Sequence, residues 1–193
     1  MRFQTSGKAL LAGAWLLYSA CGMAQAPTPV PVGELNLALT YNALQANVVQ
    51  GSRFWMNGSS AQVAVHIASG WSVIGDAAGQ HTGNMASTGT GLDLFTLTFG
   101  PQFAVQANRA VFFGQGRYGL SWGRNSLFPN GSSAPTSDLG AAIAIGGGVD
   151  LALSHRLSVR VVQAEWSRTE LNNLNANGQN SLRLSAGMVF RFR

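Results

Sequence analysis

The residue types needed for acyl-transfer chemistry lie together late in the chain. Ser154, His155 and Ser158 fall within one short segment, and Glu165 follows a little further on. A serine nucleophile, a histidine base and an orienting carboxylate form the triad of many hydrolases. A membrane-embedded, lipid-modifying hydrolase is therefore one alternative. We do not predict an enzyme, because His155 falls in a predicted tight turn and the serines stand at the wrong places for a known membrane hydrolase.

Other residue combinations that suggest ligand binding are weaker. His66, His81 and His155 are scattered over separate segments, and their spacing is not that of metal ligands. A run of three glycines occupies 146–148, but no Gly-Lys-Ser or Gly-Lys-Thr follows to complete a phosphate-binding loop. Small residues that ease the curvature of a sheet explain this run. We therefore expect no metal site, no cofactor and no catalytic residues.

The last segment of the chain indicates which kind of strand carries these residues and what surrounds it. From Ser181 to Phe192, apolar side chains alternate with serine, arginine and glycine, broken only by Val189. This is the pattern of a strand with one apolar and one polar face. Only 10% of the chain is charged, whereas a soluble domain has roughly 25%. An outer-membrane barrel, apolar outside and polar inside, fits this composition better than a soluble sandwich.

A helical membrane protein is the other way to meet lipid with so few charges. It needs an uninterrupted apolar run of about 18 residues, and the sequence has none past its N-terminus. Strands can face lipid only when they close into a barrel, because an open sheet leaves backbone groups without hydrogen-bond partners.

Alternation with a period of two recurs along the chain and predicts about eight strands. The predicted strands cover 35–42, 62–67, 71–78, 95–105, 112–122, 139–151, 157–165 and 181–193. Long polar connections at 47–59, 79–91, 123–137 and 168–179 alternate with abrupt reversals near 70, 108 and 154–155. Outer-membrane barrels have short periplasmic turns and long extracellular loops. The sequence therefore predicts an eight-stranded antiparallel up-and-down transmembrane β-barrel with both ends in the periplasm.

Two positions disturb the predicted alternation. Pro101 lies inside the fourth strand, where a proline usually marks an edge or a bulge. In the seventh strand, strict alternation would place Gln163 and Glu165 toward lipid, so we predict a bulge near Val161 and Val162 that returns both inward. Four tryptophans fall near predicted strand ends, as in the aromatic girdles of membrane proteins: Trp55, Trp71, Trp122 and Trp166.

The predicted lumen holds most of the charged residues. The interior of an eight-stranded barrel is just wide enough for its own side chains, and unpaired buried charge is costly. We therefore predict an ion-paired polar core that plugs the lumen and acts as structural filler, with Asp76 as a further acid. Its members are Arg117, Arg160, Arg183, Arg191, Asp150 and Glu165.

The N-terminus has the pattern of an export signal. Arg2 and Lys8 precede an apolar stretch and small residues, so we predict a signal peptide over 1–24, a proline-rich linker over 25–32 and the barrel domain over 33–193. A lipoprotein signal ending at Cys21 is the competing interpretation, but a tyrosine stands where its motif has an aliphatic residue. The remaining basic residues are scattered arginines, so we expect no nucleic-acid partner.

Several segments carry a family resemblance that covers almost the whole mature chain. They are Thr98-Phe99-Gly100-Pro101-Gln102-Phe103, Gly146-Gly147-Gly148-Val149-Asp150, the segment from Arg160 to Trp166, and the segment from Asn180 to Phe192. The chain resembles the OmpA-like or opacity-type family of small outer-membrane β-barrel proteins. The resemblance implies insertion by the outer-membrane assembly machinery, which reads an aromatic-ended last strand; here Arg193 follows Phe192. The peptidoglycan-binding domain of OmpA itself has no counterpart in this sequence.

These observations lead to one functional expectation with two alternatives. We expect a structural, non-enzymatic protein of the bacterial outer membrane, a monomer that contacts outer-membrane lipids and lipopolysaccharide. Its four extracellular loops would serve adhesion or surface contact with a ligand that the sequence does not identify. The alternatives are a small pore, which requires a continuous lumen past the arginines, and the lipid-modifying hydrolase.

Overall fold

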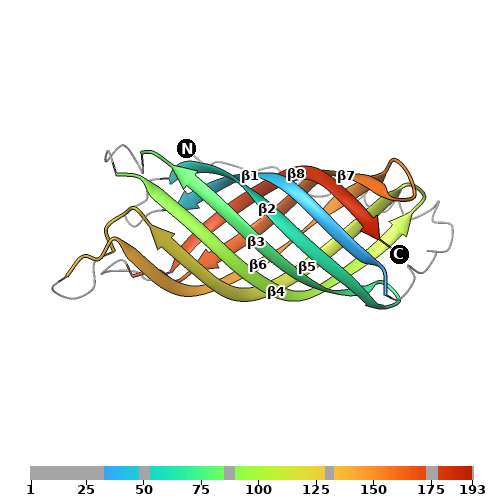
Figure 1. Cartoon of the computed structure of the whole chain (residues 1–193), viewed down its shortest axis with the longest axis horizontal. Helices are drawn as coiled ribbons and strands as arrows, with labels where there is room; N and C mark the ends of the chain where they lie inside the picture. Colours follow the sequence, from blue (N-terminus) through green and yellow to red (C-terminus); the bar gives the residue numbers. More distant parts are fainter. Residues whose placement is uncertain (1–32, 48–52, 85–89, 129–132, 173–177, 193) are drawn as a thin grey trace, which may run out of the picture.

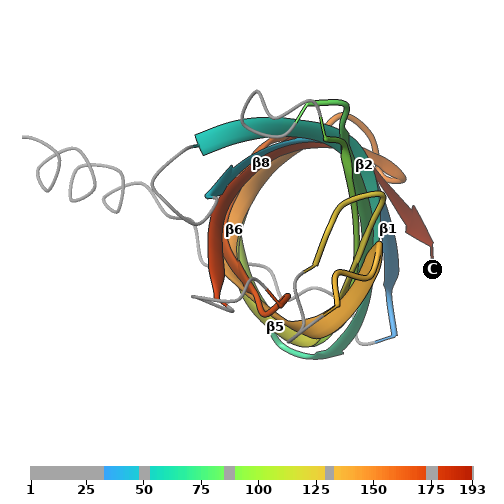
Figure 2. The ribbon, with the colours of Figure 1, turned by 90° about the vertical axis from the view of Figure 1, so that its left-hand side faces the viewer.

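The computed structural model describes residues 33–47, 53–84, 90–128, 133–172 and 178–192. They form eight antiparallel strands in one closed barrel, in which each strand pairs with its sequence neighbours and β8 pairs back to β1 (Figure 1, Figure 2). This confirms the predicted eight-stranded barrel. The predicted signal peptide and linker lie outside the described residues. The strands are β1 Leu35–Asn47, β2 Arg53–Ala68, β3 Trp71–Thr82, β4 Leu92–Ala107, β5 Ala110–Arg124, β6 Ser137–Ala152, β7 Leu157–Thr169 and β8 Gln179–Phe192.

The two ends of the barrel differ in the length of their connections. At one end the chain reverses through 69–70, 108–109 and 153–156, and we call this the short-turn end. The opposite, long-loop end carries 48–52, 83–91, 125–136 and 170–178. Leu35 pairs with Phe192, so the barrel begins and finishes at the short-turn end. No helix in the described residues is long and apolar enough to cross a membrane.

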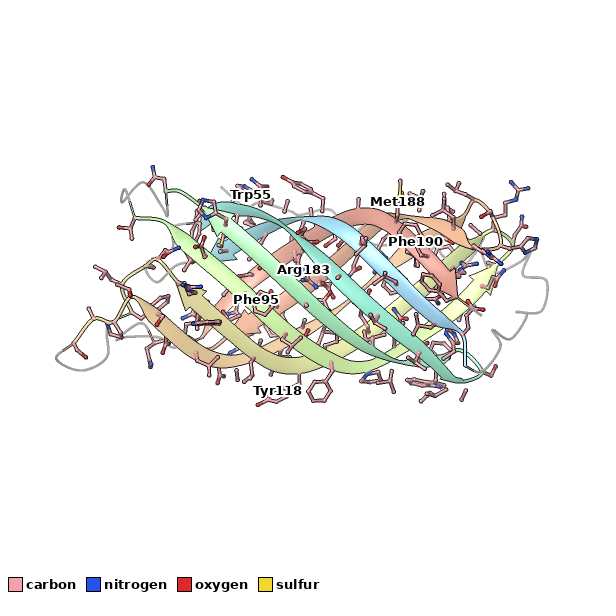
Figure 3. All side chains as sticks on the ribbon, viewed as in Figure 1. Trp55, Phe95, Tyr118, Arg183, Met188 and Phe190 are labelled. Atoms are coloured by element: carbon pink, nitrogen blue, oxygen red, sulfur yellow. The ribbon has the colours of Figure 1, made fainter. Side chains whose placement is uncertain are left out.

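The side chains divide between an apolar outer face and a largely polar lumen (Figure 3). Phe99 and Tyr118 pair across β4 and β5 and both project outward, with 64% and 57% of their surface exposed. Their neighbours Thr98 and Arg117 are buried in the lumen. A soluble protein has the opposite distribution, so the outer face is built to contact hydrocarbon. All four predicted girdle tryptophans are exposed on this face near strand ends.

The bulge predicted in β7 is present. Val149 pairs with Val162 but Asp150 pairs with Arg160, so Val161 is an extra residue on β7. Val161 and Val162 consequently both face outward, 49% and 44% exposed. Beyond the bulge the inward and outward positions of the strand are exchanged. Glu165 therefore faces the lumen, with 1% of its surface exposed.

Some predicted boundaries were wrong. The predicted loop 47–59 is shorter, because β2 already begins at Arg53, and the loop 79–91 is shorter because β3 continues to Thr82. Pro101 marks neither an edge nor a bulge. It pairs with Val73 in the interior of the β3–β4 ladder, and the β4–β5 pairing resumes at Gln102 in unchanged register. The missing donor thus leaves a local gap in the ladder and does not displace the strand.

Candidate functional site: the lumen of the barrel

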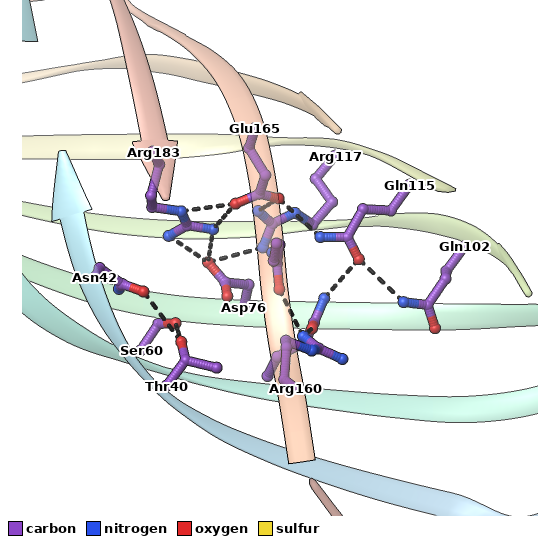
Figure 4. Close-up of polar contacts among 12 residues, drawn as sticks. Thr40, Asn42, Ser60, Asp76, Gln102, Gln115, Arg117, Arg160, Glu165 and Arg183 are labelled. Carbon is purple, nitrogen blue, oxygen red and sulfur yellow. Dashed lines mark hydrogen bonds and ion pairs between the residues drawn. The ribbon is translucent and has the colours of Figure 1, made fainter. Parts of the chain in front are cut away.

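Four charged side chains from four strands meet midway along the lumen and form what we call the charge ring: Asp76, Arg117, Glu165 and Arg183 (Figure 3, Figure 4). Asp76 Oδ1 lies 2.7 Å from Arg117 Nη1 and 3.1 Å from Arg183 Nη2. Glu165 also pairs with both arginines, accepting a hydrogen bond from Arg183 Nε at 2.7 Å. Each charge therefore touches two opposite charges, and the buried ring is electrically neutral.

A second ion pair lies beside the charge ring. Arg160 donates to both oxygens of Asp150, from Nε at 2.8 Å and from Nη2 at 3.1 Å. Its Nη1 donates to Gln62 Oε1 at 2.5 Å and to Gln163 Oε1 at 2.6 Å. The guanidinium carbon also lies 4.4 Å from the centre of the Phe113 ring, a geometry that favours a cation. Such bidentate, stacked contacts suit arginine specifically.

Glutamine side chains join the two ionic groups into one network. Gln115 Nε2 donates to Glu165 Oε1 at 2.7 Å, and Gln115 Oε1 accepts from Gln62 at 2.8 Å and from Gln102 at 3.1 Å (Figure 4). Gln62 in turn accepts from Arg160, which completes the connection. Sequence reasoning missed these glutamines, although each stands at a polar position of its alternating segment. That position was the available signal.

The network fills its level of the lumen closely. At Gly146 a Cβ atom would collide with the backbone oxygen of Ala164 and lie 2.7 Å from Glu165 Cγ, so the glycine leaves room for both the backbone of β7 and the glutamate side chain. A cavity of about 30 Å³ remains beside the ring, lined in part by Asp76, Arg117 and Arg183. That volume suits one or two water molecules.

The structure buries five of the six predicted lumen residues in this network, together with Asp76: Arg117, Arg160, Arg183, Asp150 and Glu165. Arg191 lies elsewhere. It is half-buried at the short-turn end, where it lines an open pocket together with His155 and Arg156. Its backbone N–H donates to the carbonyl oxygen of Arg156 at 2.9 Å, which ties the end of β8 to the neighbouring turn.

The residues considered for hydrolase chemistry are not brought together. Ser154 Oγ accepts from the backbone N–H groups of Arg156 and Leu157 at 3.3 and 3.1 Å, and so stabilises the short turn. His155 is exposed in that turn, whereas Glu165 is held in the charge ring. The histidines are also separate, and no three potential metal ligands cluster among the described residues.

The lumen changes character toward the long-loop end. There several inward side chains are apolar and form a buried cluster that the sequence had not indicated. It comprises Leu44, Ala46, Phe54, Met56, Leu94, Phe128 and Leu171, with Leu92 packed against it. The charge ring thus has an apolar layer between itself and the long loops.

Comparison with known proteins finds solved structures of similar fold but no related sequence. No family model and no curated protein sequence matches the chain. The crystal structure of Neisserial surface protein A superposes with a TM-score of 0.63 at 14% identity, covering 83% of this chain and 99% of that chain. The attachment invasion locus protein Ail of Yersinia pestis, in complex with the heparin analogue sucrose octasulfate, gives 0.58 at 16% identity, covering 84% and 100%. A further structure of Ail gives 0.54 at 14% identity, with the same coverage. The chain therefore has the fold of the small outer-membrane β-barrels.

Proposed function

We propose that this chain resides in the bacterial outer membrane as a closed, non-enzymatic barrel and acts through the loops at its long-loop end, in adhesion or surface contact. Residues 1–24 would direct its export, and the assembly machinery would insert it with the long-loop end outside the cell. The outward apolar face and the fold shared with outer-membrane barrels support this location. A closed barrel has no free strand edge through which to pair with a second copy, so we expect a monomer surrounded by outer-membrane lipids and lipopolysaccharide.

The charge ring is the observation that carries the proposal. A pore requires a continuous polar path, but here the arginines and acids of the ring contact one another across the lumen. An ion would have to displace buried ion pairs, which is costly. We therefore assign the ring a structural role, as the plug of the barrel.

Planar-bilayer recording tests the plug. The purified protein should give no stepwise conductance in a planar lipid bilayer, after heat-modifiable migration on a gel has shown that it is folded. Discrete single-channel steps from the folded protein would overturn the proposal of a closed barrel.

The charged residues at the long-loop end indicate whether the loops would attract a charged ligand. Three arginines and three acids stand at or beside this end: Arg53, Arg124, Arg168, Asp93, Asp138 and Glu170. This balance gives no preference for a polyanion, so electrostatic attraction to sulfated polysaccharides is not expected to dominate binding.

Loop exchange tests the surface role. Cells that display the protein should bind host matrix or sister cells, and replacing 83–91, 125–136 or 170–178 singly with a short turn should reduce that binding. A matched control inserts residues into the 153–156 turn at the opposite end, where binding should not change. Unchanged binding after all three replacements, with folded barrels, would refute the surface role.

A further inference from the structure

The apolar layer at the long-loop end surrounds a cavity that the proposed surface role does not use. We call it the mouth chamber; its apolar walls are Ala46, Phe54, Met56, Leu92, Leu94, Leu127, Phe128 and Leu171. β1, β2 and β4 supply five of these residues, and three come from the long connections. An apolar lumen is unexpected in a fold whose interior is ordinarily polar.

The connections are fastened over the chamber by hydrogen bonds. The backbone N–H of Phe128 donates to Pro135 O at 2.9 Å. The backbone of Leu171 is held from both sides by Gln179, whose Nε2 donates to Leu171 O at 2.8 Å and whose Oε1 accepts from Leu171 N at 3.1 Å. At Gly123 a Cβ atom would collide with the Phe128 ring, so this glycine allows the ring to enter the mouth. The chamber is therefore a built feature of the barrel.

The volume and lining of the chamber define what it could hold. It contains a cavity of about 110 Å³, and no charged side chain lines it. Its polar lining residues are the neutral Ser126, Thr169, Asn172, Gln179 and Ser181. Leu-, Ile- and Phe-lined cavities of about 150 Å³ stay dry and bind benzene. The chamber thus suits a small apolar body and offers no partner charge for an ion.

We propose that the mouth chamber binds one small neutral molecule with a hydrocarbon body, such as a short-chain alcohol, from the long-loop side. The hydrocarbon would pack against Met56, Phe54 and Leu94, and a hydroxyl would remain near the neutral polar rim. The charge ring below closes the way to the short-turn end, so the molecule is retained and not conducted. This site does not depend on the adhesive role of the loops.

Methionine methyl groups provide a direct test with an internal control. Met56 lines the chamber with 0% of its surface exposed, whereas Met188 faces lipid with 52% exposed. With ¹³C-methyl methionine in the protein and lipid nanodiscs as the membrane, titration with 1-hexanol should move the Met56 signal saturably. Met188 should respond only in proportion to alcohol dissolved in the bilayer. A Met56 signal that stays fixed, or that merely follows Met188, would overturn the proposal.

The charge of the probe gives a second criterion. Hexanoate has the same chain length as 1-hexanol but carries a carboxylate, for which the chamber lining has no cation. Hexanoate at neutral pH should therefore leave Met56 unmoved at concentrations where 1-hexanol saturates it. Equal saturation by both probes would contradict the neutral lining as the basis of selectivity.

Two variants connect the signal to the chamber. Ala46→Leu places a larger side chain in the chamber and should weaken 1-hexanol binding by about tenfold or more, since one methylene in an apolar pocket changes affinity by this order. Ala43→Leu, three positions earlier on the outward face of β1, is the matched control. Should Ala46→Leu fail to fold, Leu171→Ala enlarges the chamber from a connection and should tighten the binding of 1-octanol. Binding insensitive to Ala46→Leu, or to Leu171→Ala when that variant is needed, would refute the site.

Discussion

Removing one charge from the ring is the most informative perturbation of the plug. Glu165 accepts hydrogen bonds from Arg183 and Gln115 and pairs with Arg117. Glu165→Gln keeps the size of the side chain but removes its charge, so Asp76 alone would face two buried arginines. Loss of one partner from a buried ion pair costs about 3–5 kcal/mol. We expect the free energy of unfolding to fall by that amount.

The assay is equilibrium unfolding in urea, with the folded barrel in phosphatidylcholine vesicles and tryptophan fluorescence as the signal. Glu170→Gln is the matched control, because Glu170 pairs with Arg168 at 3.8 Å and both side chains are about half exposed. Exposed pairs contribute about 0–1 kcal/mol. If Glu165→Gln costs no more than Glu170→Gln, the ring does not stabilise the barrel as inferred. Adding Arg117→Gln to Glu165→Gln should recover part of the loss, and strict additivity of the two substitutions would contradict their coupling.

Three further predictions concern the strands. Deleting Val161 removes the extra residue of the β7 bulge and turns Glu165 toward lipid, so no heat-modifiable folded species should form; a normally folded barrel would show that the bulge does not set the parity. Phe99→Arg places a charge on the lipid face near the middle of β4 and should cost about 2–4 kcal/mol of unfolding free energy in vesicles; no cost there would contradict contact with hydrocarbon. Gly146→Ala should cost about 1–3 kcal/mol by crowding the backbone of β7 and the Glu165 side chain, whereas Gly79→Ala, with nothing within 4 Å of its added Cβ, should be neutral. Equal effects of the two would refute the close fit.

Alternation sufficed to predict the barrel because lipid and lumen impose opposite demands on successive residues of each strand. The β7 bulge was predictable for the same reason, since Gln163 and Glu165 could not face lipid and the sequence offered Val161 and Val162 as the place to change parity. Both glutamine and glutamate are indeed buried.

The start of β2 could not be predicted because its alternation is inverted. Phe54 and Met56 face the lumen, whereas Asn57 and Ser59 face outward. Together with Gly51, Asn57 and Gly58, which break the alternation, this led to the stretch being predicted as a loop. The inversion reflects the mouth chamber inside the barrel, a feature that appears only when the long-loop end is assembled.

Which lumen side chains pair with one another could not be predicted from the sequence either. Asp76 and Arg183 are 107 positions apart, and neither strand adjoins the other in the barrel. Periodicity predicts that a side chain faces inward, but the pairing depends on the depth and rotation of each strand. The same limit explains why Arg191, predicted for the core, lies instead at the short-turn end.

The charge ring has a consequence for how the chain enters its membrane. Its members stand on β3, β5, β7 and β8. The β7–β8 hairpin holds the opposed pair of Glu165 and Arg183, but β3–β4 and β5–β6 each carry one ring charge without its counterion. Moving such a hairpin alone through hydrocarbon is costly. Passage of the polypeptide into the bilayer should therefore be cooperative, with neutralisation of the guanidinium groups and sealing of the cylinder occurring as one event.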